Sequence, residues 1–208
     1  MTATCALMWG PRVSRAQMVA ADGPRHELPL ARWRGLATAG ERRVLEHAVG
    51  PVLDIGTGPG RFLQVLRSWG LDVLGVDDSI DAVERARALG RPAHLASVFD
   101  PLPREGRWGT VLLLDGTIGI GGDPVALLTR CRELLRPRGI ALVELEEPSQ
   151  HSYATRVRIE SGAAHGPWFA WAWINVNDLA AAAADAGLWH VKSWEEEEQR
   201  WFALLRAP

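Results

Sequence analysis

Alternating glycines behind an acidic residue are the strongest chemical signal in the sequence. The segment reads Asp54-Ile55-Gly56-Thr57-Gly58-Pro59-Gly60. Glycine at every second position lets the backbone adopt a positive φ and approach a ligand where any Cβ would collide. A second acid, Asp77, follows about 20 residues later, where a carboxylate can accept hydrogen bonds from ribose hydroxyls. Together these residues predict a site for a nucleoside-containing ligand.

A buried strand and a helix must hold this turn in place. Residues 51–55 form a short apolar run that ends in the turn, as expected for a strand covered on both faces. Apolar residues then recur at helical spacing from Phe62 to Trp69. The turn therefore opens onto a helix N-terminus, whose free N–H groups would face the ligand.

The spacing of the glycines favours one class of ligand. Dinucleotide-binding turns follow G-x-G-x-x-G, which would require glycine where this sequence has Arg61. The pattern D-x-G-x-G-x-G instead resembles the first motif of the class I S-adenosylmethionine-dependent methyltransferases. The resemblance implies an α/β fold with one Rossmann-like sheet of seven strands in the order 3-2-1-4-5-7-6. The last strand would be antiparallel, and helices would cover both faces.

Later segments follow the order of that family. The apolar runs at 71–77, 93–99, 110–115 and 140–145 predict parallel strands, and 188–194 and 200–205 predict a final hairpin. Helices are expected at 41–49, 80–89, 125–135 and 178–186, with N-caps at Ser79, Asp123 and Asn177. Residues 153–160 alternate as an exposed or edge strand would.

The resemblance also implies which residues contact the cofactor, S-adenosyl-L-methionine. The turn contributes Asp54, Gly56, Thr57, Gly58 and Gly60. Asp77 would hold the ribose, with Asp78 as the alternative, and Ser97 and Val98 would contact the adenine ring. Asp115 ends the fourth strand of the family, and Arg34 could meet the methionine carboxylate.

Two segments outside this core have open roles. Residues 1–40 are either a loosely ordered arm or a lid over the cofactor, and 41–208 form the methyltransferase domain with an acceptor-site insertion at about 148–175. Trp168, Trp171 and Trp173 in the insertion could be core residues or an aromatic wall for an acceptor. The glycine-rich loop 115–124 is either a connector or a floor beneath the transferable methyl group, with Thr117 and Ile118 facing the acceptor.

Methyl transfer to an amine or a phenolate requires mainly alignment of the reacting atoms, whereas an alcohol or a carbon acid requires a general base. His151 directly follows the fifth strand and is the favoured candidate. The alternatives are Asp115, Glu146, Tyr153 and His165.

Composition limits the remaining possibilities. The net charge of −2 argues against nucleic acid as a partner. No apolar run is long enough to span a bilayer. The two cysteines, Cys5 and Cys131, lack metal-ligand spacing, and so do the six histidines. We expect a cytoplasmic monomer or homodimer that methylates a small molecule without a metal. A silent S-adenosylmethionine-binding regulatory protein and a nicotinamide-dependent oxidoreductase are the alternatives.

Overall fold

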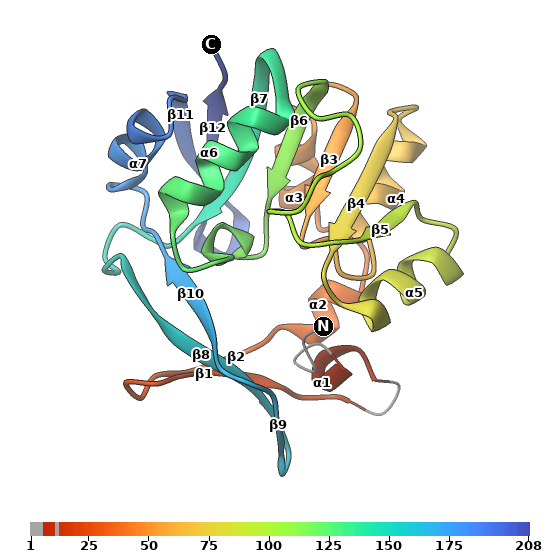
Figure 1. The fold of residues 1–208 in the computed structure, drawn as a ribbon, viewed down its shortest axis with the longest axis vertical. Coiled ribbons are helices and arrows are strands. Elements are labelled where there is room, and N and C mark those ends of the chain that lie inside the picture. The colour runs from red at the N-terminus through yellow and green to blue at the C-terminus, as the bar shows by residue number, and fades with distance from the viewer. Residues whose placement is uncertain (1–5, 11–12) are drawn as a thin grey trace.

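The computed structural model of the protein describes residues 6–10 and 13–208, and Cys5 lies outside this range. A seven-stranded sheet forms its centre (Figure 1). The strands are β3 Val52–Ile55, β4 Val73–Asp77, β5 Ala93–Leu95, β6 Trp108–Leu113, β7 Leu135–Leu145, β11 Trp189–Glu196 and β12 Arg200–Arg206. Their order is β11-β12-β7-β6-β3-β4-β5, and β12 is antiparallel to both of its neighbours. This arrangement confirms the predicted fold.

Helices cover both faces of this sheet because its central strands are apolar on both sides. Helices α6 Pro124–Leu134 and α7 Leu179–Asp185 pack into one apolar cluster, and α3 Ala39–Leu45 and α4 Arg61–Ser68 pack into another on the opposite face. Helix α5 Ile80–Ala88 packs beside β4 and β5. The Oγ atom of Ser79 and the Oδ1 atom of Asp123 cap α5 and α6 as predicted.

A second sheet joins segments from distant parts of the chain. Strands β1 Gln17–Ala20 and β2 Arg25–Glu27 come from the N-terminal region. They pair with β8 Tyr153–Ser161 and β10 Phe169–Trp173 of the insertion in the order β10-β8-β1-β2, and β9 Ala164–His165 pairs with β8. Two short helices, α1 Ala6–Trp9 and α2 Leu30–Arg34, flank the N-terminal strands. We call the four strands β1, β2, β8 and β10 the lid sheet.

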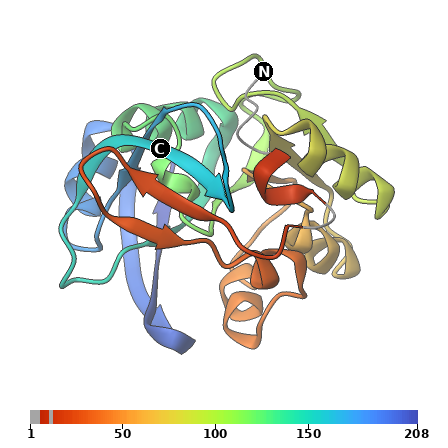
Figure 2. The same ribbon diagram turned by 90° about the horizontal axis from the view of Figure 1, so that it is seen from below.

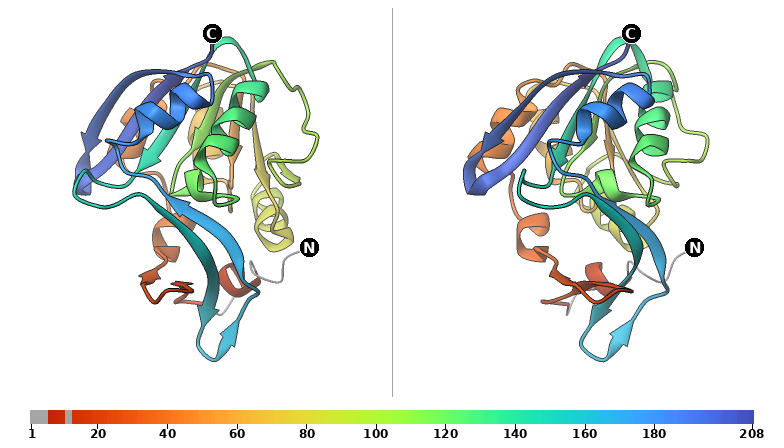
Figure 3. Two further views of the ribbon diagram at one scale, coloured as in Figure 1. Left: turned by 60° about the vertical axis from the view of Figure 1, so that its left-hand side comes forward. Right: turned by 90° about the vertical axis from the view of Figure 1, so that its left-hand side faces the viewer.

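The lid sheet lies beneath the carboxyl ends of the parallel strands. Figure 1 shows β4 and β6 pointing down toward it, and the view from below in Figure 2 shows β1, β2, β8 and β10 side by side. The side views of Figure 3 show β8 and β10 curving away from the central sheet. This placement covers the edge at which open α/β sheets bind their ligands.

Two local predictions were wrong, and a third was right in part. Residues 153–160 form an exposed strand as one alternative predicted, since Ala154 and Arg156 of β8 are exposed. The other alternative, an edge strand, is wrong, because β8 pairs with β1 on one side and β10 on the other. Helix α7 has Asp178 as its N-cap without a side-chain cap. The expected strand at 93–99 ends at Leu95, because Ser97 and Asp100 form a turn.

Candidate active site

A cavity of about 590 Å³ lies between the central sheet and the lid sheet. Its upper wall consists of the loops after β3, β4, β5 and β6, and its lower wall is formed by β1, β2, β10 and helix α2. This volume is in the range typical of small-molecule sites. The cavity is therefore large enough to hold small molecules such as a cofactor and an acceptor.

The glycine turn forms the upper wall as the sequence predicts. Gly56, Gly58 and Gly60 all have positive φ, of 68°, 54° and 77°. A Cβ added at Gly58 would lie 3.1 Å from the Trp9 ring, so a larger residue would narrow the cavity. Thr57 donates its hydroxyl to Asp54 over 2.6 Å, and burial raises the pKa of Asp54 to about 7.

Asp77 stands at the end of β4 and lines the cavity. Its two carboxylate oxygens accept hydrogen bonds from the backbone N–H groups of Gly58, at 2.8 Å, and Ser79, at 2.9 Å. These bonds fix the carboxylate at the strand end, although burial raises its pKa to about 6. Asp78, Ser97 and Val98 also line the cavity, in the order along the sheet that the resemblance implies.

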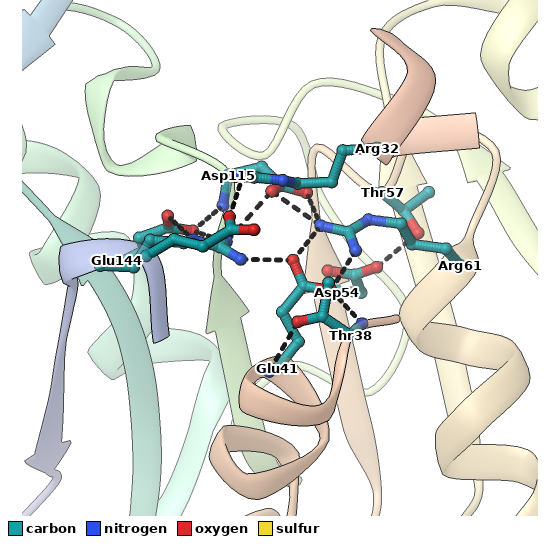
Figure 4. A network of polar contacts seen from close by, with 10 residues as sticks. Arg32, Thr38, Glu41, Asp54, Thr57, Arg61, Asp115 and Glu144 are labelled. Carbon is teal, nitrogen blue, oxygen red and sulfur yellow. Dashed lines mark hydrogen bonds and ion pairs between the residues drawn. The ribbon is translucent and has the colours of Figure 1, made fainter. Parts of the chain in front are cut away.

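Asp115 belongs to an ion-pair network that closes the upper wall (Figure 4). Arg61 donates to both Asp115 oxygens at 2.8 Å and pairs with Glu41, and Arg200 bridges Glu41 and Glu144. Asp115 itself has a φ of 58°, which is rare for a residue with a Cβ. Burial, followed by the charge of Glu144, raises the pKa of Asp115 to about 6 despite both arginines.

The glycine-rich loop after Asp115 is shaped by the close approach of β10. A Cβ on Gly119 would lie 2.2 Å from the Ala172 carbonyl oxygen, and one on Gly122 would lie 2.8 Å from Ala170. Thr117, in the 3-10 turn Thr117–Gly119, lines the cavity and is 8% exposed. Its hydroxyl has no hydrogen-bond partner among the described residues. Ile118 is buried behind the cavity wall instead of lining it.

The insertion supplies part of an aromatic lower wall. Trp171 and Trp173 share one face of β10 and line the cavity, whereas Trp168 is 36% exposed and lies against Arg158 outside it. Tyr153 stacks on Trp173 with 4.6 Å between ring centroids. Sequence reasoning missed His26, which lines the cavity and lies 3.2 Å from the Tyr153 hydroxyl. No local pattern marks His26, because only the pairing of β1 with β8 brings it there.

Besides Ile118 and Trp168, four predicted site residues do not line the cavity: Gly60, Tyr153, Arg34 and His151. Arg34 donates to the backbone carbonyls of Met8 and Val13 and anchors the N-terminal segment, while its neighbours Arg32 and Trp33 line the cavity. His151 is exposed in the loop before β8. Glu146, by contrast, lines the cavity at the end of β7.

A protein-family model described as a methyltransferase domain matches residues 25–193. The chain belongs to this family. It has no long apolar helix able to cross a membrane in its described part. The residues that the structure describes likewise contain no cluster of His, Cys, Asp and Glu suited to holding a metal ion.

Similar proteins agree with this membership. A ubiquinone biosynthesis O-methyltransferase of Rhodopseudomonas palustris is 31% identical over 112 residues, which are 51% of this chain and 44% of that protein. The chain therefore matches about half the length of such relatives. The structure of an S-adenosylmethionine-dependent methyltransferase from Bacteroides fragilis, in complex with S-adenosylhomocysteine, has a TM-score of 0.78 and 25% identity, covering 99% of this chain and 93% of that one.

A third similar structure shares the fold alone. It is the 1,6-didemethyltoxoflavin-N1-methyltransferase of Burkholderia thailandensis, with 20% identity, a TM-score of 0.56 and coverage of 75% of this chain and 70% of that one. The family membership and the Bacteroides fragilis structure give S-adenosyl-L-methionine as the cofactor of this methyltransferase. Its residues fit that cofactor, because the glycine turn leaves backbone facing the cavity and Asp77 presents a fixed carboxylate at the end of β4.

Proposed function

We propose that this protein transfers the methyl group of S-adenosyl-L-methionine to a small-molecule acceptor held beneath the lid sheet. The observation that carries the proposal is a cavity that the glycine turn and the lid sheet line together. One wall has the residues expected to hold a nucleoside, and the facing wall is aromatic. A buried cavity of this kind suits a small acceptor better than a macromolecule.

Different residues of the cavity would bind the different parts of the cofactor. Asp77 would accept hydrogen bonds from the ribose hydroxyls, and Ser97 and Val98 would flank the adenine ring. Arg32 and Trp33 are placed to meet the methionine end, and the buried Trp33 Nε1 has no partner among the described residues. When bound, S-adenosylmethionine supplies an electrophilic methyl group attached to a positively charged sulfur.

The chain's contribution to the reaction is alignment and exclusion of water. The lid sheet covers the strand ends, and Asp115, Thr117 and Glu146 border the space between the glycine turn and Trp173. Asp115 and Glu146 carry negative charge that favours the sulfonium. Because Arg61 and Arg200 already hold Asp115, it would act by position and charge.

An oxygen acceptor has one observation in its favour. The curated relatives are named for O-methylation in ubiquinone biosynthesis, although the match covers about half of each protein. In that case His26, beside the Tyr153 hydroxyl, would be the base in place of His151.

Calorimetric titration of the protein with S-adenosylhomocysteine, NAD and NADP tests the cofactor assignment. We expect binding of S-adenosylhomocysteine alone, and a loss of roughly 10- to 100-fold in affinity in Asp77→Ala, because hydrogen bonds to a charged group contribute about 1.5–3 kcal/mol each. Asp72→Ala is the control, since Asp72 is exposed and pairs with Arg104 outside the cavity.

Turnover must be measured separately with labelled S-adenosylmethionine and a panel of amines, phenols and alcohols. Methylation of any member supports an enzyme. Tight binding of S-adenosylhomocysteine without methylation across the whole panel would favour a silent cofactor-binding protein. Binding of a nicotinamide nucleotide would reject the assignment of the glycine turn.

A further inference from the structure

The cavity has an excess of acidic over basic side chains. Two arginines line it, and both are engaged: Arg32 pairs with Glu198 at 2.5 Å, and Arg61 pairs with Glu41 and Asp115. The acidic residues that line it are Glu27, Asp54, Asp77, Asp78, Asp115 and Glu146. Such a cavity favours positively charged guests over anions.

Glu146 differs from the acids on the cofactor side. Asp54 accepts a hydrogen bond from Thr57, Asp77 accepts two from backbone amides, and Asp115 pairs with arginines. The Glu146 carboxylate has no hydrogen bond or ion pair within the described part of the chain. Burial and the neighbouring charges of Glu144 and Glu147 raise its pKa. A half-buried carboxylate of this kind lacks the partner that such groups normally require.

Glu146 lines the same cavity as several aromatic rings. Its backbone N–H bonds the Ile174 carbonyl at 2.9 Å, which places it beside the end of β10. Trp173 and Glu146 line the main cavity and also a small cavity of about 50 Å³ that Gly116 borders with them. Tyr153 stacks on Trp173, and the His26 ring lies 4.9 Å from the same indole. A carboxylate beside stacked rings is suited to binding an ammonium group through ion pairing and cation–π attraction.

The Thr117 hydroxyl is a second group without a partner in this region. It follows Gly116 directly, lines the cavity, and its Oγ1 is buried without a hydrogen bond to any described residue. A hydroxyl oxygen can accept an N–H bond, so an acceptor that carries several N–H donors would satisfy both Glu146 and Thr117.

We propose that the acceptor is an arylalkylamine, an aromatic ring that carries an aliphatic ammonium group, and that this ammonium group binds between Glu146 and Trp173. This inference rests on the proposed function and specifies its substrate class. Glu146 takes one proton from the ammonium group and leaves a neutral amine with a free lone pair. The nitrogen–methyl bond then forms as the methyl–sulfur bond breaks, the electron pair of that bond stays on sulfur, and the product is a methylated ammonium. Glu146 afterwards returns its proton to solvent.

Three probes with one indole skeleton test the charge preference of the cavity. Tryptamine carries an ammonium group, tryptophol a neutral hydroxyl and indole-3-acetate a carboxylate. We expect tryptamine to bind the protein loaded with S-adenosylhomocysteine and to be methylated in the presence of S-adenosylmethionine. The other two should bind at least tenfold more weakly and should not be methylated.

Glu146→Gln isolates the carboxylate, and Glu147→Gln is the matched control. Glu147 is partly exposed and accepts hydrogen bonds from Ser149 and Gln150, which a glutamine side-chain oxygen can also accept. We expect kcat/KM for tryptamine to fall roughly 100-fold or more in Glu146→Gln, as for loss of a general base, and to change less than twofold in Glu147→Gln. Unchanged affinity for S-adenosylhomocysteine shows that Glu146→Gln is folded.

Three results would each overturn the inference: no binding of tryptamine to the loaded protein, equal methylation of tryptophol, or equal effects of the two glutamine variants. In each of these cases, binding of S-adenosylhomocysteine and methylation of another panel member would leave the proposed function standing. Failure of the wild-type protein to bind S-adenosylhomocysteine would instead reject the proposed function itself.

Discussion

Three aspartates of the active site have surroundings that disfavour their charged form. Asp54 is buried, Asp77 and Asp115 are half-buried nearby, and loss of solvent contact raises the pKa of each. Each retains some hydrogen-bond or ion-pair support, so the carboxylates persist at a cost in folding free energy. Binding sites often contain such carboxylates, which lower the stability of the protein but recognise its ligand.

Asp54 offers a clean test of this cost. Its pKa is about 7 in the folded protein and 3.8 for the free side chain, so the folded state binds the proton more tightly. The free energy of unfolding should therefore rise as the pH falls from 8 to 5. Asp54→Asn removes this ionisable group and keeps an acceptor for Thr57. We expect the variant to be more stable than the wild type at pH 8, with a smaller difference at pH 5.

Urea unfolding of both proteins at several pH values in this range measures the effect. The comparison cancels the contributions of Asp77 and Asp115, which titrate in the same range and are present in both proteins. Parallel curves for the two proteins would contradict the assigned pKa of Asp54.

At the scale of the elements, the loop after β6 and strand β10 depend on close contact. Gly119 lies under the Ala172 carbonyl, and Ile120 forms an isolated bridge with Trp171. The glycine-rich composition of this loop is thus explained by a neighbouring strand that leaves no room for side chains. The same contact positions Trp171 and Trp173 against the upper wall.

Gly119→Ala should push the loop after β6 and strand β10 apart. The added Cβ would lie 2.2 Å from the Ala172 oxygen and 2.5 Å from Trp171 Nε1, so the strand must move. We expect a destabilisation of about 1–3 kcal/mol, typical of overpacking, and a fall in turnover that exceeds any loss of affinity for S-adenosylhomocysteine. Unfolding and steady-state assays measure these effects.

Gly40→Ala is the control for this substitution. Gly40 lies in helix α3, and a Cβ there would meet its neighbours no closer than 3.6 Å. This variant should be as active as the wild type. Equal behaviour of the two alanine variants would show that the contact between the loop and β10 does not position the acceptor wall.

At the scale of the whole molecule, the lid sheet joins the two segments whose roles the sequence left open. Met18 of β1 pairs with Ile159 of β8, and Ala172 of β10 pairs with Ala154 of the same strand. The N-terminal arm and the insertion therefore share one hydrogen-bonded sheet, and we expect them to open as one cooperative unit.

Hydrogen exchange can test whether this unit responds as a whole. Binding of S-adenosylhomocysteine should slow amide exchange in residues 17–20 and 153–161 together, because opening either strand breaks bonds of both. Residues 189–196, on the far edge of the central sheet, serve as a control and should change little. Slower exchange in only one of the two lid segments would contradict a single unit.

The resemblance to a known family implied the strand order of the central sheet. The sequence by itself determined the strands of that sheet and the cofactor turn. These features have local causes: apolar runs define the strands, glycines permit the turn, and Asp77 follows at a fixed distance along the chain. Such signals are contained within about 30 residues, the length of one βαβ unit. They could therefore be predicted without knowledge of the rest of the fold.

Only the tertiary structure decided what faces the cofactor turn. His26 meets Tyr153, and Arg200 meets Glu41, through contacts between segments more than a hundred residues apart. The alternation of 153–160 predicted a strand but not its partners, since strand pairing depends on segments elsewhere in the chain. The orientation of α2 likewise directed Arg32 into the cavity and Arg34 away from it. Side-chain direction follows from packing, and packing is a property of the whole chain.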